Sequence, residues 1–385
     1  MKESLRIENF GPIKCVDIKD VKPFMVFIGK SATGKSCILK LLALFRYIFK
    51  LTNIRSYFHH SRITRSPFRV DFKLLVKRNG LAEMFSPETR IVYTCQGESG
   101  NTYSIVYEHK KLSKLPDVAQ EDLLFLKGVF VAETRGVLSY WIGSGLPESK
   151  LGFYFQETAE IFSEASEAEG EVEIPGLEVK FQVGKAKNGK KIYKVVPDST
   201  EGESFRFTDA SSGMQSTIPL AVIVKYMADK FDFDNAFNRS VLDYMVRNER
   251  LKDFRPVAGI EGFQRRVAVH IEEPELSLDP FRQTILADFL ADTLFHNHKQ
   301  DRQCSLMFTT HTPYLADYVN VLMAKWENDN STGVDPALVD VWLLDENGTA
   351  TSVMVTDDHG RPVVNTDFLA TQIEESYARY EQLRH

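Results

Sequence analysis

Residues 29–36 read GKSATGKS, which satisfies the pattern GxxxxGK(S/T). The five residues before them, 24–28, are apolar and predict a buried strand, whereas residues 37–45 carry apolar side chains at helical spacing. A glycine-rich loop between a strand and a helix lets backbone N–H groups face a polyphosphate, and the positive end of the helix dipole adds to the attraction. The order strand, loop and helix therefore predicts a nucleotide-binding site.

The side chains of this loop have separate expected roles. We expect Lys35 to reach the β- and γ-phosphates and the Ser36 hydroxyl to bind Mg²⁺. A chance glycine-rich turn is the alternative interpretation, and the flanking strand and helix argue against it. The residues expected to contact ATP are Gly29, Lys30, Ser31, Ala32, Thr33, Gly34, Lys35, Ser36 and Cys37.

Polar side chains also follow two later apolar runs. Residues 267–271 predict a strand that ends in Glu272 and Glu273, and residues 305–310 predict a strand followed by His311. In a parallel nucleotide-binding sheet these ends lie beside the phosphate loop. One carboxylate can join the Mg²⁺ shell, the next can activate the attacking water, and the histidine can touch a γ-phosphate. Without the other two motifs, a histidine in this position would more often be structural than functional.

Several segments resemble the ABC-type ATPases, in particular their RecF/OLD/SMC-like branch, many members of which are called AAA-family ATPases. Ser211–Gln215 resembles the signature motif, and Ser277–Pro280 resembles the D-loop. Residues 271–280 (IEEPELSLDP) and 309–315 (TTHTPYL) look like that branch. The opening residues 5–13 and the segment 129–135 look like it too.

The resemblance implies roles for individual residues. Ser212 and Gly213 match signature residues that touch the γ-phosphate bound to the opposite subunit, and Asp279 lies in the D-loop. Met214 stands where transporters carry a second glycine. ATP and Mg²⁺ are the implied cofactors, and an ATP-dependent homodimer or higher oligomer is the implied assembly.

The catalytic residues follow from the same resemblance. Glu273 matches the water-activating carboxylate, and His311 matches the switch histidine. Glu272 fills a place often held by Asp, which favours contact to Mg²⁺ through water. No glutamine stands out as the Q-loop residue, and Glu133 and Arg135 lie in the corresponding region.

Together, the element pattern and the resemblance predict an α/β fold. It is an ABC-ATPase head with a mainly parallel P-loop core sheet, an antiparallel β subdomain and a helical signature lobe. We expect a single head over residues 1–385, with the core in 1–50 and 262–330, the antiparallel region in 66–130, an insertion and the signature lobe in 137–260, and a hairpin and helix in 335–385. Local patterns further predict strands at 68–72 and 102–107, a solvated helix or linker at 155–173, a hairpin around Asn188-Gly189 and a closing helix at 368–383.

Composition and charge narrow the class of protein. The chain has 43% apolar and 26% charged residues, a net charge of −6 and four cysteines without CxxC spacing. These values favour a cytoplasmic globular protein with reduced thiols. No apolar run approaches the ~18 residues of a membrane span, so we expect no membrane contact.

Two basic stretches are candidates for contact with nucleic acid. Arg62, Arg65 and Arg69 lie among aromatic residues, which suits phosphate contact with base stacking. A solvated insertion or a protein-binding face is the alternative, and we favour it. The lysines of residues 185–194 more often guard an edge strand.

Four functions agree with these patterns to different degrees. We favour a dimeric ATPase that acts as a switch or sensor for a separately encoded effector, as in bacterial anti-phage or toxin systems. A DNA-repair ATPase of the RecF kind is the alternative. A transporter subunit is disfavoured because IEEPE and SSGMQ depart from transporter motifs. An OLD-type nuclease is disfavoured because residues 315–385 are few for a further domain.

Overall fold

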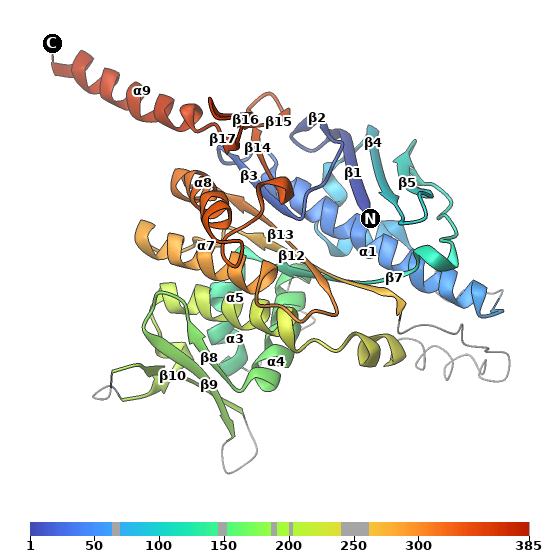
Figure 1. Cartoon of the computed structure of the whole chain (residues 1–385), viewed down its shortest axis with the longest axis horizontal. Helices are drawn as coiled ribbons and strands as arrows, with labels where there is room; N and C mark the ends of the chain where they lie inside the picture. The colour runs from blue at the N-terminus through green and yellow to red at the C-terminus, as the bar shows by residue number, and fades with distance from the viewer. Residues whose placement is uncertain (64–69, 145–151, 186–190, 200–202, 240–261, 385) are drawn as a thin grey trace.

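The computed structural model describes residues 1–63, 70–144, 152–185, 191–199, 203–239 and 262–384 (Figure 1). These residues form a six-stranded central sheet in the order β15-β14-β3-β13-β12-β7. The parallel strands are β3 (Phe24–Gly29), β7 (Leu124–Val131), β12 (Gln264–Glu272), β13 (Gln303–Thr310) and β14 (Val339–Leu344), and β15 (Ala350–Ser352) is antiparallel. The central strands are apolar and buried, as expected for a parallel sheet covered on both faces.

An antiparallel sheet lies on one side of this core, in the order β2-β1-β4-β5-β6. Its strands are β1 (Lys2–Phe10), β2 (Ile13–Ile18), β4 (Phe85–Gln96), β5 (Thr102–Glu108) and β6 (Lys111–Leu112). Helix α1 (Lys35–His60) lies between the two sheets (Figure 1). It is apolar on nearly all sides, as a helix in that position must be. Phe45 and Phe49 pack against Tyr93 of β4, with ring centroids 6.1 and 6.2 Å apart.

Helices cover the opposite face of the central sheet (Figure 1). Helix α5 (Ser212–Asp229) packs against β12, and α7 (Pro280–Phe295) packs against β13 and α5. Further helices are α2 (Phe72–Arg78), α3 (Leu138–Ser144), α4 (Phe153–Glu169), α8 (Pro313–Asn328) and α9 (Asp367–Arg384), and residues 233–239 are helical as well. Short 3-10 turns include η1 (Ala82–Met84), η2 (Gln120–Asp122), η3 (Glu133–Val137), η5 (Phe207–Asp209) and η7 (Pro336–Leu338).

Two smaller sheets complete the described structure. The first has the order β11-β10-β9-β8, and the second pairs β16 with β17. Their strands are β8 (Glu171–Ile174), β9 (Val179–Lys185), β10 (Lys191–Pro197), β11 (Phe205–Arg206), β16 (Met354–Thr356) and β17 (Pro362–Val364). The first sheet packs against α4 and α5.

The predicted α/β class is confirmed, with a parallel sheet around the loop at 29–36 and a separate antiparallel sheet. Strands β9 and β10 form the predicted hairpin, whose turn at Asn188-Gly189 lies outside the described residues. Strand β7 belongs to the parallel sheet although its residues fall in the region 66–130. The division of the chain into regions remains a prediction.

Three local predictions need correction. The strand predicted at 68–72 is wrong at its described end, because Asp71 accepts a hydrogen bond from the Leu74 N–H and caps α2. The segment 155–173 is neither linker nor fully solvated, since α4 buries Ile161 and Phe162 and β8 follows it. The predicted C-terminal helix is present as α9, but it extends away from the body and its residues 377–384 are exposed (Figure 1).

Candidate nucleotide-binding site

The glycine-rich loop connects β3 to α1 and needs glycine at two positions. Gly29 has φ +153°, and a Cβ there would lie 2.4 Å from the backbone oxygen of Leu344. Gly34 has φ +103°, and a Cβ there would lie 2.9 Å from Ile13. Neither position has room for a side chain. The β1–β2 turn and strand β14 therefore hold the loop in its conformation.

Lys35 lies at the start of α1 with its side chain turned back over the loop. Its ammonium donates to the backbone oxygens of Gly29 and Lys30, both at 2.8 Å, and lies 3.3 Å from His311 Nδ1. Burial lowers the pKa of Lys35 to about 8, and the charges of Glu273 and Glu275 oppose that shift. A cation is thus held at the carboxyl edge of the parallel sheet, where the sequence predicts phosphate binding.

Glu273 and His311 meet although they follow different strands. The Nε2 atom of His311 lies 2.9 Å from Oε1 of Glu273, and both side chains are partly exposed. Glu273 has φ +46°, a strained conformation for a non-glycine residue. Its N–H donates to the Thr309 backbone oxygen at 3.1 Å, which holds this turn against β13.

A third carboxylate, that of Glu275, holds the backbone at His311. It is buried, and its Oε1 accepts from the Thr310 hydroxyl at 2.7 Å and from the His311 N–H at 3.1 Å. Burial raises the pKa of Glu275, and these hydrogen bonds act in the opposite direction. Sequence reasoning assigned no role to Glu275, although it stands in the same EEPE string as Glu272 and Glu273.

Glu272 is buried at the end of β12 and has a cationic neighbour that the sequence reasoning missed. Its Oε1 lies 2.8 Å from Lys40 Nζ, one turn along α1 from Ser36. The N–H of Glu133 donates to its Oε2 at 3.4 Å. A hydroxyl and a carboxylate are donors that suit Mg²⁺, so Ser36 and Glu272 fit that ion. The ion pair with Lys40 favours contact from Glu272 through water.

Arg135 connects the turn after β12 to helix α5, whose first residues are the predicted signature residues. Its guanidinium is fully buried and donates to the backbone oxygens of Glu272 at 2.7 Å and Glu273 at 2.6 Å. It also donates to Ser216 in α5 at 3.0 Å. Burial lowers the pKa of Arg135 to about 10. The sequence placed this residue in the Q-loop region but did not indicate these contacts.

The predicted signature and D-loop residues lie together, apart from the Lys35 cluster. Ser212 is exposed at the first turn of α5, and a Cβ at Gly213 would lie 3.1 Å from the Ser277 backbone oxygen. Asp279 caps α7 by accepting from the N–H groups of Phe281 and Arg282. Cys37, the last residue expected to contact ATP, has a buried side chain that lies 3.3 Å from the sulfur of Met84.

The other loop residues have more varied surroundings. Thr33 donates to the Lys30 backbone oxygen at 2.9 Å, and Lys30 pairs with Glu346 at 2.8 Å. Ser31 and Ala32 are exposed, and Ala32 has φ +65°.

Of the three arginines considered for nucleic acid, Arg62 is exposed with φ +66°. Arg65 and Arg69 lie outside the described residues. Within the described part of the chain, no helix is long and apolar enough to cross a bilayer.

Comparison with known proteins finds only remote similarity. No family model and no curated protein match the chain. An SMC head bound to the C-winged helix domain of ScpA is similar, with 11% identity, coverage of 92% of this chain and 98% of that one, and a TM-score of 0.42. An SMC head domain from Thermotoga maritima gives 10% identity, 93% and 100% coverage and a TM-score of 0.39.

A third similar structure is an Smc head with an extended coiled coil, bound to the C-terminal domain of ScpA derived from Pyrococcus furiosus. It has 11% identity to this chain, 99% coverage of both chains and a TM-score of 0.42. A likeness this remote assigns neither an activity nor a partner to this chain.

Proposed function

We propose that this chain binds ATP with Mg²⁺ at residues 29–37 and hydrolyses it to ADP and phosphate. The observation that carries the proposal is the meeting of Lys35, His311 and Glu273. The lysine and histidine lie 3.3 Å apart, and the histidine and glutamate lie 2.9 Å apart. A cation, an imidazole and a carboxylate beside a glycine-rich loop supply the positioning, charge stabilisation and proton acceptor that phosphoryl transfer needs.

Each of these residues has a distinct step in the proposed reaction. Lys35 and the loop N–H groups hold the β- and γ-phosphates, and Glu273 accepts a proton from the attacking water. The new bond joins the water oxygen to the γ-phosphorus, and the bond to the β-phosphate oxygen breaks. His311, whose backbone N–H donates to Glu275, contacts the γ-phosphate. Mg²⁺, held by Ser36 and through water by Glu272, would neutralise charge on the phosphate oxygens.

The second part of the proposal is a head-to-head dimer around ATP. Ser212 and Gly213 of each copy would contact the γ-phosphate bound to the other copy, with Asp279 in the adjoining loop. Ser212 is exposed at the N-terminus of an 18-residue helix, an end that favours anions.

The third part is the biological role. We propose a cytoplasmic, nucleotide-controlled switch for a separately encoded effector in anti-phage defence, and the resemblance to the RecF/OLD/SMC-like branch supports this. The test is purification of the native chain with ADP or with ATP, followed by assay of any partner's activity in both states. A partner regulated by nucleotide supports the switch, whereas strong stimulation of ATPase turnover by DNA would favour the RecF-type alternative.

The test of the ATPase itself is Glu273→Gln. This substitution keeps the side-chain shape and removes the proton acceptor, so ATP binding should persist while turnover falls by ~10²–10⁴. The control is Glu83→Gln in η1, where the glutamate is exposed. Turnover in Glu273→Gln equal to that of the control would contradict the assignment of the base.

A further inference from the structure

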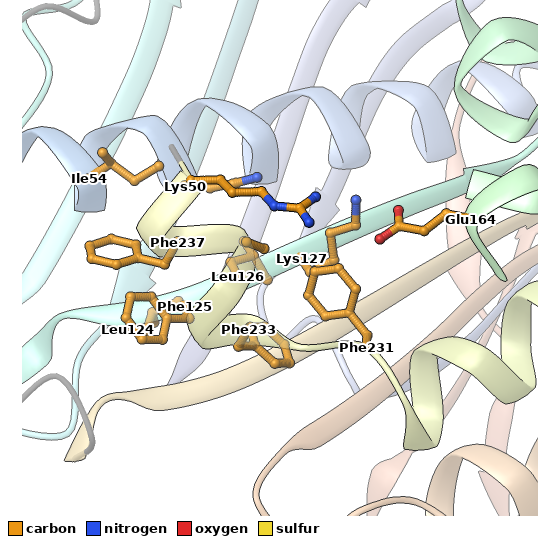
Figure 2. A pocket seen from close by; sticks show the side chains of 12 residues that line it. Lys50, Ile54, Leu124, Phe125, Leu126, Lys127, Glu164, Phe231, Phe233 and Phe237 are labelled. Carbon is orange, nitrogen blue, oxygen red and sulfur yellow. The ribbon is translucent and has the colours of Figure 1, made fainter. Parts of the chain in front are cut away.

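A second cavity lies on the far side of α1 from the antiparallel sheet and is not part of the nucleotide-binding site. Its volume is about 340 Å³, within the range of small-molecule sites. It lies between the C-terminal half of α1, the start of β7, α4 and residues 231–239 (Figure 2). We refer to it as the α1–β7 cavity.

One wall of the α1–β7 cavity is aromatic. Phe125 and Phe237 pack with their ring centroids 4.5 Å apart, and Phe231 and Phe233 pack edge to face at 5.0 Å. Figure 2 shows these four rings on one side of the space. Such a wall suits a flat apolar group, because aromatic pairs contribute stacking energy beyond the area they bury.

Positively charged groups line the same cavity. The ammonium groups of Lys50 on α1 and Lys127 on β7 lie above the phenylalanine rings in Figure 2, and Lys127 Nζ is 5.3 Å from the centroid of the Phe231 ring. Arg239 adds a third cation, and Glu164 is the acidic residue in this lining. The Glu164 carboxylate already accepts a hydrogen bond from Tyr226 at 2.8 Å. The lining therefore has an excess of positive charge.

The two lysines are placed where an anion would stabilise them. Among the described residues, no carboxylate oxygen lies within 4.0 Å of either ammonium nitrogen, the N···O limit for an ion pair. Burial and, to a smaller extent, the nearby charge of Lys127 lower the pKa of Lys50 to about 8, whereas Glu157 opposes the shift. Burial lowers the pKa of Lys127 as well. A bound anion would favour the charged form of both lysines.

The carboxyl group of Glu157 lies near the same two lysines. It lines a neighbouring cavity of about 190 Å³ that shares both lysines and also contains Arg78. Burial raises the pKa of Glu157 to about 7, and the charges of Lys127 and Lys50 oppose that shift. Three cations (Lys50, Lys127 and Arg239) against two carboxyl groups (Glu164 and Glu157) leave an excess of positive charge here.

From this arrangement we propose that the α1–β7 cavity binds a small organic anion with an aromatic ring. Its carboxylate, sulfonate or phosphate group lies between Lys50 and Lys127, and its ring lies against the phenylalanine wall. The site is separate from the glycine-rich loop and does not depend on ATP hydrolysis.

The test compares two matched fluorescent probes on the full chain. The first is 8-anilinonaphthalene-1-sulfonate, and the second is N-phenyl-1-naphthylamine, which has the same rings without the sulfonate. The chain carries Lys35→Ala so that the glycine-rich loop does not compete for the anion. We expect one saturable site that binds the sulfonate about tenfold or more tightly than the neutral probe.

Substitution of the lysines should remove this preference. Lys50→Met and Lys127→Met each keep an extended side chain and should weaken the sulfonate about tenfold, leaving the neutral probe unchanged. Lys77→Met, at an exposed lysine on α2, is the matched control. Thermal unfolding of each variant is measured, and its probe affinity is compared with that of the parent only at a temperature where both are folded.

A second measurement uses the chain without cavity substitutions. Phenyl phosphate should protect Lys50 and Lys127, but not Lys77, from reductive methylation detected by peptide mass spectrometry. Equal binding of the two probes to the parent would overturn the proposal. So would unchanged sulfonate binding in both lysine variants, or equal methylation with and without phenyl phosphate.

Discussion

Replacement of Arg135 by methionine tests the connection between the turn at residues 272–276, which carries the proposed base Glu273, and helix α5. The guanidinium is 0% exposed and donates to backbone oxygens in three segments. Its acceptors are Ala132 at 3.2 Å, Ser216 at 3.0 Å, Glu272 at 2.7 Å, Glu273 at 2.6 Å and Pro274 at 3.3 Å. Methionine has similar length but donates no hydrogen bond.

The magnitude follows from the acceptors left behind. Each buried oxygen without a donor costs roughly 1–3 kcal/mol, and the three shortest contacts are the ones that matter most. Loss of a buried, desolvated cation offsets part of that cost. Three such acceptors give roughly 3–9 kcal/mol before that offset, so we expect a net loss of about 3–5 kcal/mol.

The assay is equilibrium unfolding in guanidinium chloride, with Arg302→Met as the matched control. Arg302 is also buried, but it donates to Met227 and Asp301 away from the site. Both variants should lose stability, yet only Arg135→Met should lose turnover in its folded fraction, by about 10², because displacement of a catalytic group by about 1 Å has that effect. A loss below about 1 kcal/mol, or equal turnover in the two variants, would refute the reasoning.

Three further predictions concern the nucleotide. Lys35→Ala should lose binding of an ATP analogue in calorimetry, measured at a temperature where its unfolding curve shows the variant to be folded; unchanged affinity would contradict the loop assignment. Ser212→Arg should bind the analogue as a monomer but fail to hydrolyse ATP, and normal turnover by that monomer would exclude the head-to-head dimer. Since burial lowers the pKa of Lys35 to about 8 and phosphate favours its charged form, analogue affinity should fall by up to about tenfold per pH unit above that value. Lys35→Arg should remove that dependence, and a flat affinity profile in the parent would refute it.

Local patterns predicted the elements that carry the site. The strand before Gly29 and the helix after Ser36 follow from a short apolar run, two glycines and helical periodicity. Glu273 and His311 each follow an apolar run that became β12 or β13, and parallel strands bring their carboxyl ends to one edge. Adjacent ends in a parallel sheet therefore made the meeting of these two residues predictable.

The failed strand at 68–72 shows the limit of such patterns. Five alternating residues are too few to separate a strand from the start of a helix. Phe72 instead stacks on Tyr107 at 4.9 Å and packs edge to face on Phe85 at 5.8 Å. Because both partners come from other strands, tertiary packing decided the local structure.

The roles of Lys40 and Arg135 at the site were not predicted, for a different reason. Lys40 lies on the face of α1 that meets Glu272. Arg135 donates to backbone oxygens, and every residue has one, so the sequence does not indicate which of them accept. A buried arginine is rare unless its donors are satisfied. The position of Arg135 in the sequence, close after an apolar run, does not identify the groups that accept from it. Those acceptors depend on how η3, α5 and the end of β12 pack.

This packing explains how α5 can influence the turn at residues 272–276 without contacting the Glu273 side chain. Arg135 holds Ser216 of α5 and Glu273 at once, and the Ser216 hydroxyl donates to Leu276, three residues beyond Glu273, at 2.7 Å. A shift of α5 would stretch contacts of 3.0 and 2.7 Å, and buried hydrogen bonds weaken steeply with misalignment. The backbone oxygen that accepts from Arg135 belongs to Glu273, the residue with the strained φ of +46°. Movement of α5 on formation of the proposed dimer would therefore reach Glu273, the proposed base, through hydrogen bonds to backbone oxygens.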